Sequence, residues 1–148
     1  MEELKPATIL LVEDDLGDQK LVKVSLKTQK IANKLHVVKS GEEAFDFLYQ
    51  RGDYNDGTPR PDLILLDLKM PGMGGKEFLR RVKEDEDLRK TPVIILTSSD
   101  SEKDILDSYN LQASGYVKKP VDLGGFKDVM KEINEYWFVI CKLLPKGE

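Results

Sequence analysis

Cysteine, histidine and long apolar segments are scarce in this chain of 148 residues. The single cysteine, Cys141, cannot form an internal disulfide, so we expect a reducing, cytoplasmic environment. The single histidine, His36, lacks the partners that a metal site needs, and we interpret it as a residue at a sheet edge. No apolar run approaches the roughly 20 residues of a membrane span, and the N-terminus lacks the apolar core of a signal peptide, so we expect no membrane attachment.

Positive charge is not in excess either. Lysine and arginine together number 23 and aspartate and glutamate 27, which gives a net charge of −4. Binding to nucleic acid needs a basic surface, so this balance argues against a nucleic-acid partner. A chain of this length with 40% hydrophobic residues is most simply one globular domain with a substantial core.

Short apolar runs alternate with amphipathic stretches along the chain. The apolar runs lie at 8–12, 35–38, 63–66, 93–96 and 115–117. Ser40 with Glu43, and Ser101 with Asp104, have the spacing that opens a helix. Strands that alternate with helices form a parallel sheet covered on both faces. We therefore predict an α/β fold, namely a flavodoxin-like (βα)5 doubly wound parallel sheet with strand order 2-1-3-4-5.

Polar side chains follow four of the five predicted strands. Asp67 ends the aliphatic run 63–66, and a carboxylate at the edge of a buried sheet is costly unless something there uses it. The carboxyl ends of parallel strands meet at one edge of the sheet, where ligands bind. The residues expected there are Glu13, Asp14 and Asp15 after the first strand, Asp67 after the third, Thr97 after the fourth and Lys119 after the fifth.

These residue types together favour phosphoryl chemistry. Clustered carboxylates repel one another, and a divalent cation relieves the repulsion. Oxygen ligands with open positions suit Mg²⁺, which would also neutralise charge while a carboxylate attacks a phosphoryl group. Thr97 can donate a hydrogen bond to a phosphoryl oxygen, and Lys119 offers a positive charge to another. An aspartate nucleophile such as Asp67 forms an acyl phosphate.

Four segments, in this order and spacing, resemble the signatures of bacterial response-regulator receiver domains. They are Leu11-Val12-Glu13-Asp14-Asp15, Leu66-Asp67-Leu68-Lys69-Met70-Pro71-Gly72, Leu96-Thr97-Ser98 and Lys119-Pro120. The resemblance implies one receiver domain over residues 1–148, with a core at about 7–135 and an extended C-terminal helix or tail at 136–148.

The resemblance also implies a role for each residue at the sheet edge. Asp67 would accept a phosphoryl group from a sensor histidine kinase or a histidine phosphotransfer protein. Glu13 and Asp14 would be the acid pair, and both acids, Asp67 and the backbone carbonyl of Lys69 would form the Mg²⁺ site. The switch residues would be Thr97 and Tyr116, with Lys119 facing the phosphate and a cis peptide bond joining Lys119 to Pro120.

A narrower resemblance concerns the loop from Gly52 and the aromatic ending that begins at Tyr136. Both are similar to the single-domain subfamily that pairs with phytochrome-type histidine kinases. We expect no output domain after the receiver match, and we therefore expect the signal to leave through a partner protein or through a homodimer formed by the last helix. We expect the lifetime of the phosphoryl group to depend on Lys69 and Ser99, the residues two positions after the phosphoacceptor and the switch hydroxyl.

Other functions fit the residues less well. A phosphatase of the haloacid dehalogenase type needs a second aspartate two residues after the nucleophile, where this chain has Lys69, so at most we expect catalysis of its own phosphorylation and dephosphorylation. Flavin binding on this fold would place a phosphate beside Glu13 and Asp14, which would repel it. A receiver-like scaffold that is never phosphorylated stays open, as does a plain helix-capping role for the acid pair.

Overall fold

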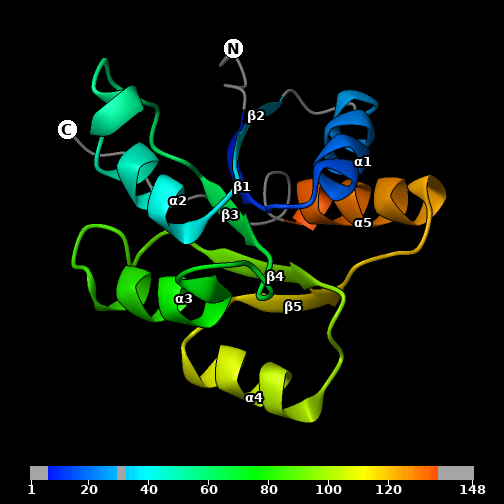
Figure 1. The fold of residues 1–148 in the computed structure, drawn as a ribbon. Helices are drawn as coiled ribbons and strands as arrows, with labels where there is room; N and C mark the ends of the chain where they lie inside the picture. Colours follow the sequence, from blue (N-terminus) through cyan, green and yellow to red (C-terminus); the bar gives the residue numbers. More distant parts are fainter. Residues whose placement is uncertain (1–6, 30–32, 137–148) are drawn as a thin grey trace.

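The computed structural model describes residues 7–29 and 33–136. In these residues five parallel strands form one sheet in the order β2-β1-β3-β4-β5 (Figure 1). The strands are β1 (Ala7–Val12), β2 (Asn33–Val38), β3 (Leu63–Leu66), β4 (Val93–Thr97) and β5 (Gly115–Lys118). The predicted fold class and strand order are both confirmed.

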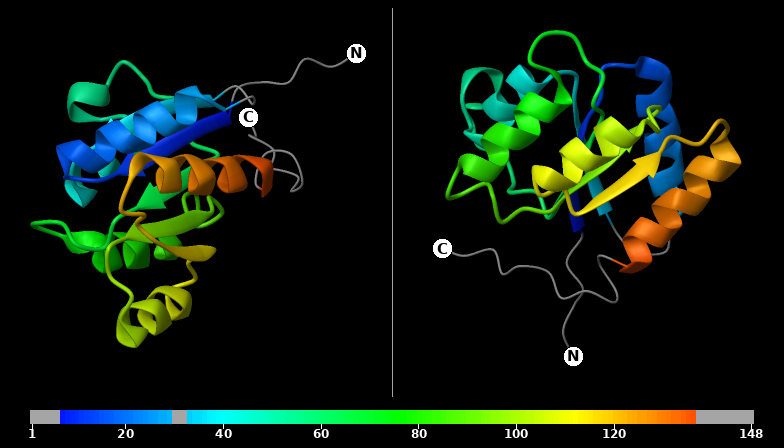
Figure 2. Two further views of the ribbon diagram at one scale, coloured as in Figure 1. Left: turned by 90° about the vertical axis from the view of Figure 1, so that its right-hand side faces the viewer. Right: turned by 90° about the horizontal axis from the view of Figure 1, so that it is seen from below.

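Helices cover both faces of this sheet. They are α1 (Leu16–Lys27), α2 (Gly41–Leu48), α3 (Gly74–Glu84), α4 (Glu102–Asn110) and α5 (Leu123–Glu135), with a short 3-10 helix, η1 (Gly52–Tyr54), in the long loop after α2. Helices α1 and α5 lie side by side on one face, and α2 and α3 cover the other, with α4 beside the edge strand β5 (Figures 1 and 2). None of these helices has the length and apolar character needed to cross a membrane.

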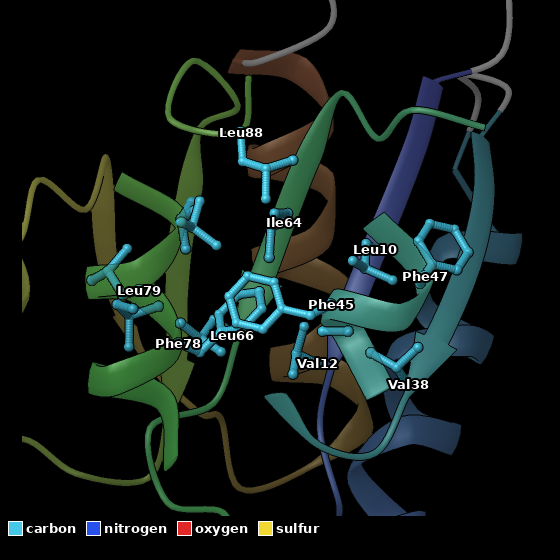
Figure 3. Packing of buried hydrophobic residues seen from close by; sticks show 14 of the residues in the cluster. Leu10, Val12, Val38, Phe45, Phe47, Ile64, Leu66, Phe78, Leu79 and Leu88 are labelled. Carbon is cyan, nitrogen blue, oxygen red and sulfur yellow. The ribbon is translucent and has the colours of Figure 1, made fainter. Parts of the chain in front are cut away.

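Both faces of the central strand β3 are buried, which explains its unbroken aliphatic sequence. Ile64 and Leu66 pack toward α2 and α3, where the rings of Phe45 and Phe78 lie 4.9 Å apart between centroids (Figure 3). The alternate residues Leu63 and Leu65 belong to a second apolar cluster with α1 and α5. The core therefore fixes where β3 ends, and with it the position of Asp67.

Two predicted helix starts are confirmed. The Ser40 hydroxyl accepts a hydrogen bond from the Glu43 backbone N–H at 3.0 Å, and Ser101 accepts one from Asp104 at 3.1 Å. Such caps satisfy N–H groups that have no partner within the helix.

The predicted edge position of His36 is also confirmed, because it lies on the outer strand β2 with its ring 5.2 Å from that of Phe47. Tyr136, the last described residue, is 53% exposed. The rest of the segment expected to form a dimer, including Trp137, lies outside the described residues.

Candidate functional site

The carboxyl ends of four strands meet around an open hollow of about 660 Å³. Its lining includes polar residues from the segments after β1, β3, β4 and β5 and from the first turn of α1. They are Glu13, Asp14, Asp15, Asp18, Asp67, Lys69, Ser98 and Lys119. The structure thus brings together residues that lie far apart in the sequence, at the edge of the sheet where the sequence pattern places them.

Three carboxylates form the acidic part of the site. Glu13, Asp14 and Asp67 each offer an oxygen within 4.8 Å of the others. The side chains of Glu13 and Asp67 are buried, whereas Asp14 is exposed. A cluster of oxygen ligands that is buried on one side and open on the other fits a hard divalent cation that keeps some of its water.

The pKa of Glu13 is shifted by its position in this cluster. Burial raises the pKa of Glu13 to about 7, the charge on Asp67 acts in the same direction, and a hydrogen bond from Lys119 opposes them. Because several carboxylates surround the single ammonium of Lys119, the site carries an excess of acidic groups, and a bound cation would relieve it.

Lys119 is the positive group at the centre of the site. Its Nζ lies 2.6 Å from Glu13 Oε1, 2.8 Å from Asp18 Oδ2 and 3.4 Å from Asp67 Oδ2. Burial by itself lowers the pKa of Lys119, but the hydrogen bonds to Asp18 and Glu13 outweigh it and hold the pKa above its usual value. The neighbouring Lys118 turns away and pairs with Asp100 in solvent, as the alternation of side chains along a strand requires.

The helix-capping interpretation of the acid pair does not fit the geometry. Asp15 caps α1 by accepting a hydrogen bond from the Asp18 backbone N–H at 2.8 Å. Glu13 accepts the Asp15 backbone N–H with its Oε2 and directs its Oε1 to Lys119. The carboxylate of Asp14 joins the cluster with Asp67. Capping and site formation thus use different side chains.

A glycine determines how closely α3 approaches Asp67. A Cβ on Gly75 would lie 2.4 Å from the Asp67 carbonyl oxygen and 2.6 Å from the Leu68 Cα. The Gly75 N–H donates to the Leu68 carbonyl at 3.0 Å, which ties the start of α3 to the end of β3. Sequence reasoning missed this residue, although the pair Gly74-Gly75 just before a helical pattern is a signal of close backbone approach.

Thr97 and Tyr116 are connected through the loop after β4. The Thr97 side chain is fully buried, and its hydroxyl has no hydrogen-bond partner among the described residues. Two residues later, the Ser99 carbonyl accepts a hydrogen bond of 2.8 Å from the half-buried Tyr116 hydroxyl. The Ser99 hydroxyl donates to Asp104 on α4.

An ion pair extends this connection to α3. The Nζ of Lys76 lies 2.6 Å from Asp104 and 2.9 Å from Asp107. Hydrogen bonds from Lys76 first, and then from Ser99, lower the pKa of Asp104 to about 2. The loop that follows Thr97 is therefore linked to both α3 and α4.

The predicted cis peptide bond between Lys119 and Pro120 is wrong, because this bond is trans in the structure. The two isomers of such a bond differ by only about 0.5–1 kcal/mol, so surrounding contacts rather than the local sequence select one. Pro120 packs closely against Gly125, where a Cβ would lie 2.6 Å from the Pro120 Cβ. The Lys119 N–H donates to the Thr97 carbonyl at 2.7 Å, so strand pairing carries Lys119 to the site.

Comparison with known proteins agrees with this geometry. The family model for the response regulator receiver domain matches residues 9–131. The chain belongs to the response-regulator receiver family. It is 40% identical over 136 residues to response regulator Rcp1 of Synechocystis sp., with 92% of each protein covered.

Two solved structures are similar over nearly the whole chain. The Mn²⁺-bound form of Rcp1 has a TM-score of 0.86 at 38% identity, and the match covers 95% of this chain and 100% of Rcp1. The phosphorylated cyanobacterial phytochrome response regulator RcpA has a TM-score of 0.89 at 35% identity, with the same coverage. The predicted likeness to phytochrome response regulators is confirmed, and the chain is a response-regulator receiver.

Proposed function

We propose that Asp67 is the phosphoacceptor of this receiver and that the donor is the phosphohistidine of a sensor kinase or of a histidine phosphotransfer protein. The observation that carries this proposal is the position of the Asp67 carboxylate. It is buried, shares the oxygen cluster with Glu13 and Asp14, and lies 3.4 Å from the ammonium of Lys119. Such a carboxylate is oriented for attack on a phosphoryl group and stabilised once it carries one.

The transfer is a displacement at phosphorus. A carboxylate oxygen of Asp67 forms a bond to phosphorus while the bond from phosphorus to the histidine nitrogen breaks. The electron pair of that bond stays on the imidazole, which takes a proton from water. Lys119 then faces the negative phosphoryl oxygens, and the backbone N–H of Lys69, which lies 3.4 Å from Asp67 Oδ1, approaches from the other side.

The metal in this proposal is Mg²⁺. Glu13, Asp14, Asp67 and the backbone carbonyl of Lys69 would hold it, and the buried carboxylates of Glu13 and Asp67 support this assignment. When bound, Mg²⁺ supplies positive charge between the carboxylate and the incoming phosphoryl group.

Thr97 and Tyr116 are the switch in this proposal. A phosphoryl oxygen gives the unpaired Thr97 hydroxyl an acceptor, and movement of Thr97 displaces Ser99, whose carbonyl binds Tyr116. Since Ser99 also contacts Asp104, the displacement reaches α4 and the surface around β5. Phosphorylation would then shift the population between two arrangements of this surface.

The signalling context completes the proposal. Residues 1–148 form one receiver domain that works in the cytoplasm, where the single Cys141 stays reduced. It acts on no external substrate and at most catalyses its own phosphorylation and dephosphorylation. Its output is a partner protein or a homodimer through the last helix, and the half-exposed Tyr136 supports the dimer.

Incubation with acetyl phosphate and Mg²⁺, followed by intact-mass measurement, tests the phosphoacceptor. We expect the wild-type protein to gain one phosphoryl group, and Asp67→Asn to gain none. Removal of Mg²⁺ with a chelator should abolish the gain. A wild-type protein that gains nothing would favour the unphosphorylated scaffold instead.

A further inference from the structure

Lys119 has a third acidic partner that no role assigned above explains. Its Nζ lies 2.8 Å from Asp18 Oδ2, a contact between residues 101 positions apart in the chain. We propose that Asp18 is a positioning residue that holds Lys119 in the resting state and competes with the phosphoryl group for it. This inference rests on the proposed phosphorylation of Asp67.

Asp18 stands apart from the metal-binding cluster. The carboxylates that approach within 4.8 Å of one another are those of Glu13, Asp14 and Asp67, whereas Asp18 lies in the first turn of α1. Nor does Asp18 cap its helix, because its neighbour Asp15 does so. Its side chain is directed across the site to the lysine that follows β5.

A phosphoryl group on Asp67 would bring further anionic oxygens to Lys119, and these compete with the resting partners of its ammonium. The ammonium has three N–H groups and lies near three carboxylates in the resting site. Glu13 is 1% exposed, so water cannot take the place of the lysine beside its Oε1. The side chain of Asp18 is 26% exposed, and water can replace the lysine there.

Of the contacts with Glu13 and Asp18, the one with Asp18 is therefore the more easily exchanged when Lys119 turns to the phosphoryl oxygens. The strength of this contact opposes the phosphorylated state, because every bond that Lys119 keeps with Asp18 weakens its bond to the phosphoryl group. Asp18 would thus shorten the lifetime of the acyl phosphate by acting through Lys119, with no contact to the metal.

The test is the lifetime of the phosphorylated protein, followed by intact mass after the phosphodonor is removed. Asp18→Asn keeps the size of the side chain and removes its charge. We expect a lifetime about fivefold longer than wild type, which corresponds to the upper end of the interaction energies of partly exposed ion pairs. Asp18→Glu keeps the charge and should return the lifetime toward wild type. Asp18→Ala should repeat the effect of Asp18→Asn, which covers the case that one variant folds poorly.

Asp100→Asn is the matched control, since it removes the same charge from the exposed pair with the adjacent Lys118. Its lifetime should stay within about twofold of wild type, below the effect of a well-formed pair. A double-mutant cycle separates action through Lys119 from a general charge effect. In a Lys119→Ala background, Asp18→Asn should no longer change the lifetime, and an equal effect in both backgrounds would overturn the proposal.

The two proposals fail in different ways. If the wild-type protein accepts no phosphoryl group, the phosphoacceptor assignment and the role of Asp18 are both wrong. If the wild-type protein is phosphorylated and Asp18→Asn has the wild-type lifetime, only the role of Asp18 is wrong. A changed Mg²⁺ affinity large enough to explain the longer lifetime would also refute it, because Asp18 would then act as part of the metal site.

Discussion

Gly75→Ala is predicted to damage both the stability of the protein and the site at Asp67. The added Cβ would meet the Asp67 carbonyl oxygen at 2.4 Å and the Leu68 Cα at 2.6 Å. Both are backbone atoms, so no side chain can rotate to make room. Either α3 moves away from β3 by several tenths of an ångström, or the end of β3 shifts and takes Asp67 with it.

The expected loss in the free energy of unfolding is about 2 kcal/mol, within the range of 1–3 kcal/mol for overpacking a dense core. For a domain of this size that corresponds to a fall of roughly 4–8 °C in Tm. Denaturant titration followed by far-ultraviolet circular dichroism measures the loss, and a Mg²⁺ titration measures the displacement of Asp67 as a weaker affinity.

Gly124→Ala is the matched control for this substitution. Gly124 also lies in the first turn of a helix, but a Cβ there would lie 3.8 Å from Asp122 Oδ1, an ordinary van der Waals contact. Alanine should stabilise this exposed helical position by about 0.4–1 kcal/mol. The two substitutions should therefore move stability in opposite directions. A Gly75→Ala protein as stable as wild type, with unchanged Mg²⁺ affinity, would refute the argument that this glycine determines the approach of α3.

Two further predictions concern the charged groups. Burial raises the pKa of Glu13 from 4.5 to about 7, so between these pH values the folded protein holds a proton on Glu13 that the unfolded chain has lost. The contribution of Glu13 to the free energy of unfolding therefore falls as the pH rises from about 4.5 through 7. Mg²⁺ should then raise Tm more at pH 8 than at pH 6, and an equal gain at both would contradict this. Lys76→Met should raise the pKa of Asp104 from about 2 toward 3.8 in an NMR titration and cost at most about 1 kcal/mol of stability. Lys103→Met should leave that pKa unchanged, because Lys103 pairs with Asp107.

The sequence predicted those features that depend on local pattern. The run 63–66 forms a strand with the predicted bounds, since four consecutive aliphatic residues bounded by turn residues suit a short strand covered on both faces. The polar residues after the strands reach one edge because parallel strands all point the same way. From that rule alone, Glu13, Asp67 and Lys119 could be expected to meet.

What the sequence did not predict depends on how elements pack. The contact of Asp18 with Lys119 depends on how α1 lies relative to the segment after β5. No local sequence pattern predicts this arrangement. The need for glycine at position 75 appears only once α3 is placed against β3. The isomer at Pro120 involves less than about 1 kcal/mol, so packing against Gly125 can decide it.

The buried Thr97 hydroxyl has a thermodynamic consequence for signalling. A buried polar group without a hydrogen bond destabilises the state that contains it by about 1–3 kcal/mol. If phosphorylation supplies the missing acceptor, the hydrogen bond forms in the phosphorylated state and not in the resting state. Its free energy then favours the phosphorylated arrangement over the resting one. A difference of about 1–3 kcal/mol shifts an equilibrium by roughly 5–150-fold. The hydrogen bond that the Thr97 hydroxyl lacks in the resting protein can therefore contribute to the free energy by which a phosphoryl group shifts this equilibrium.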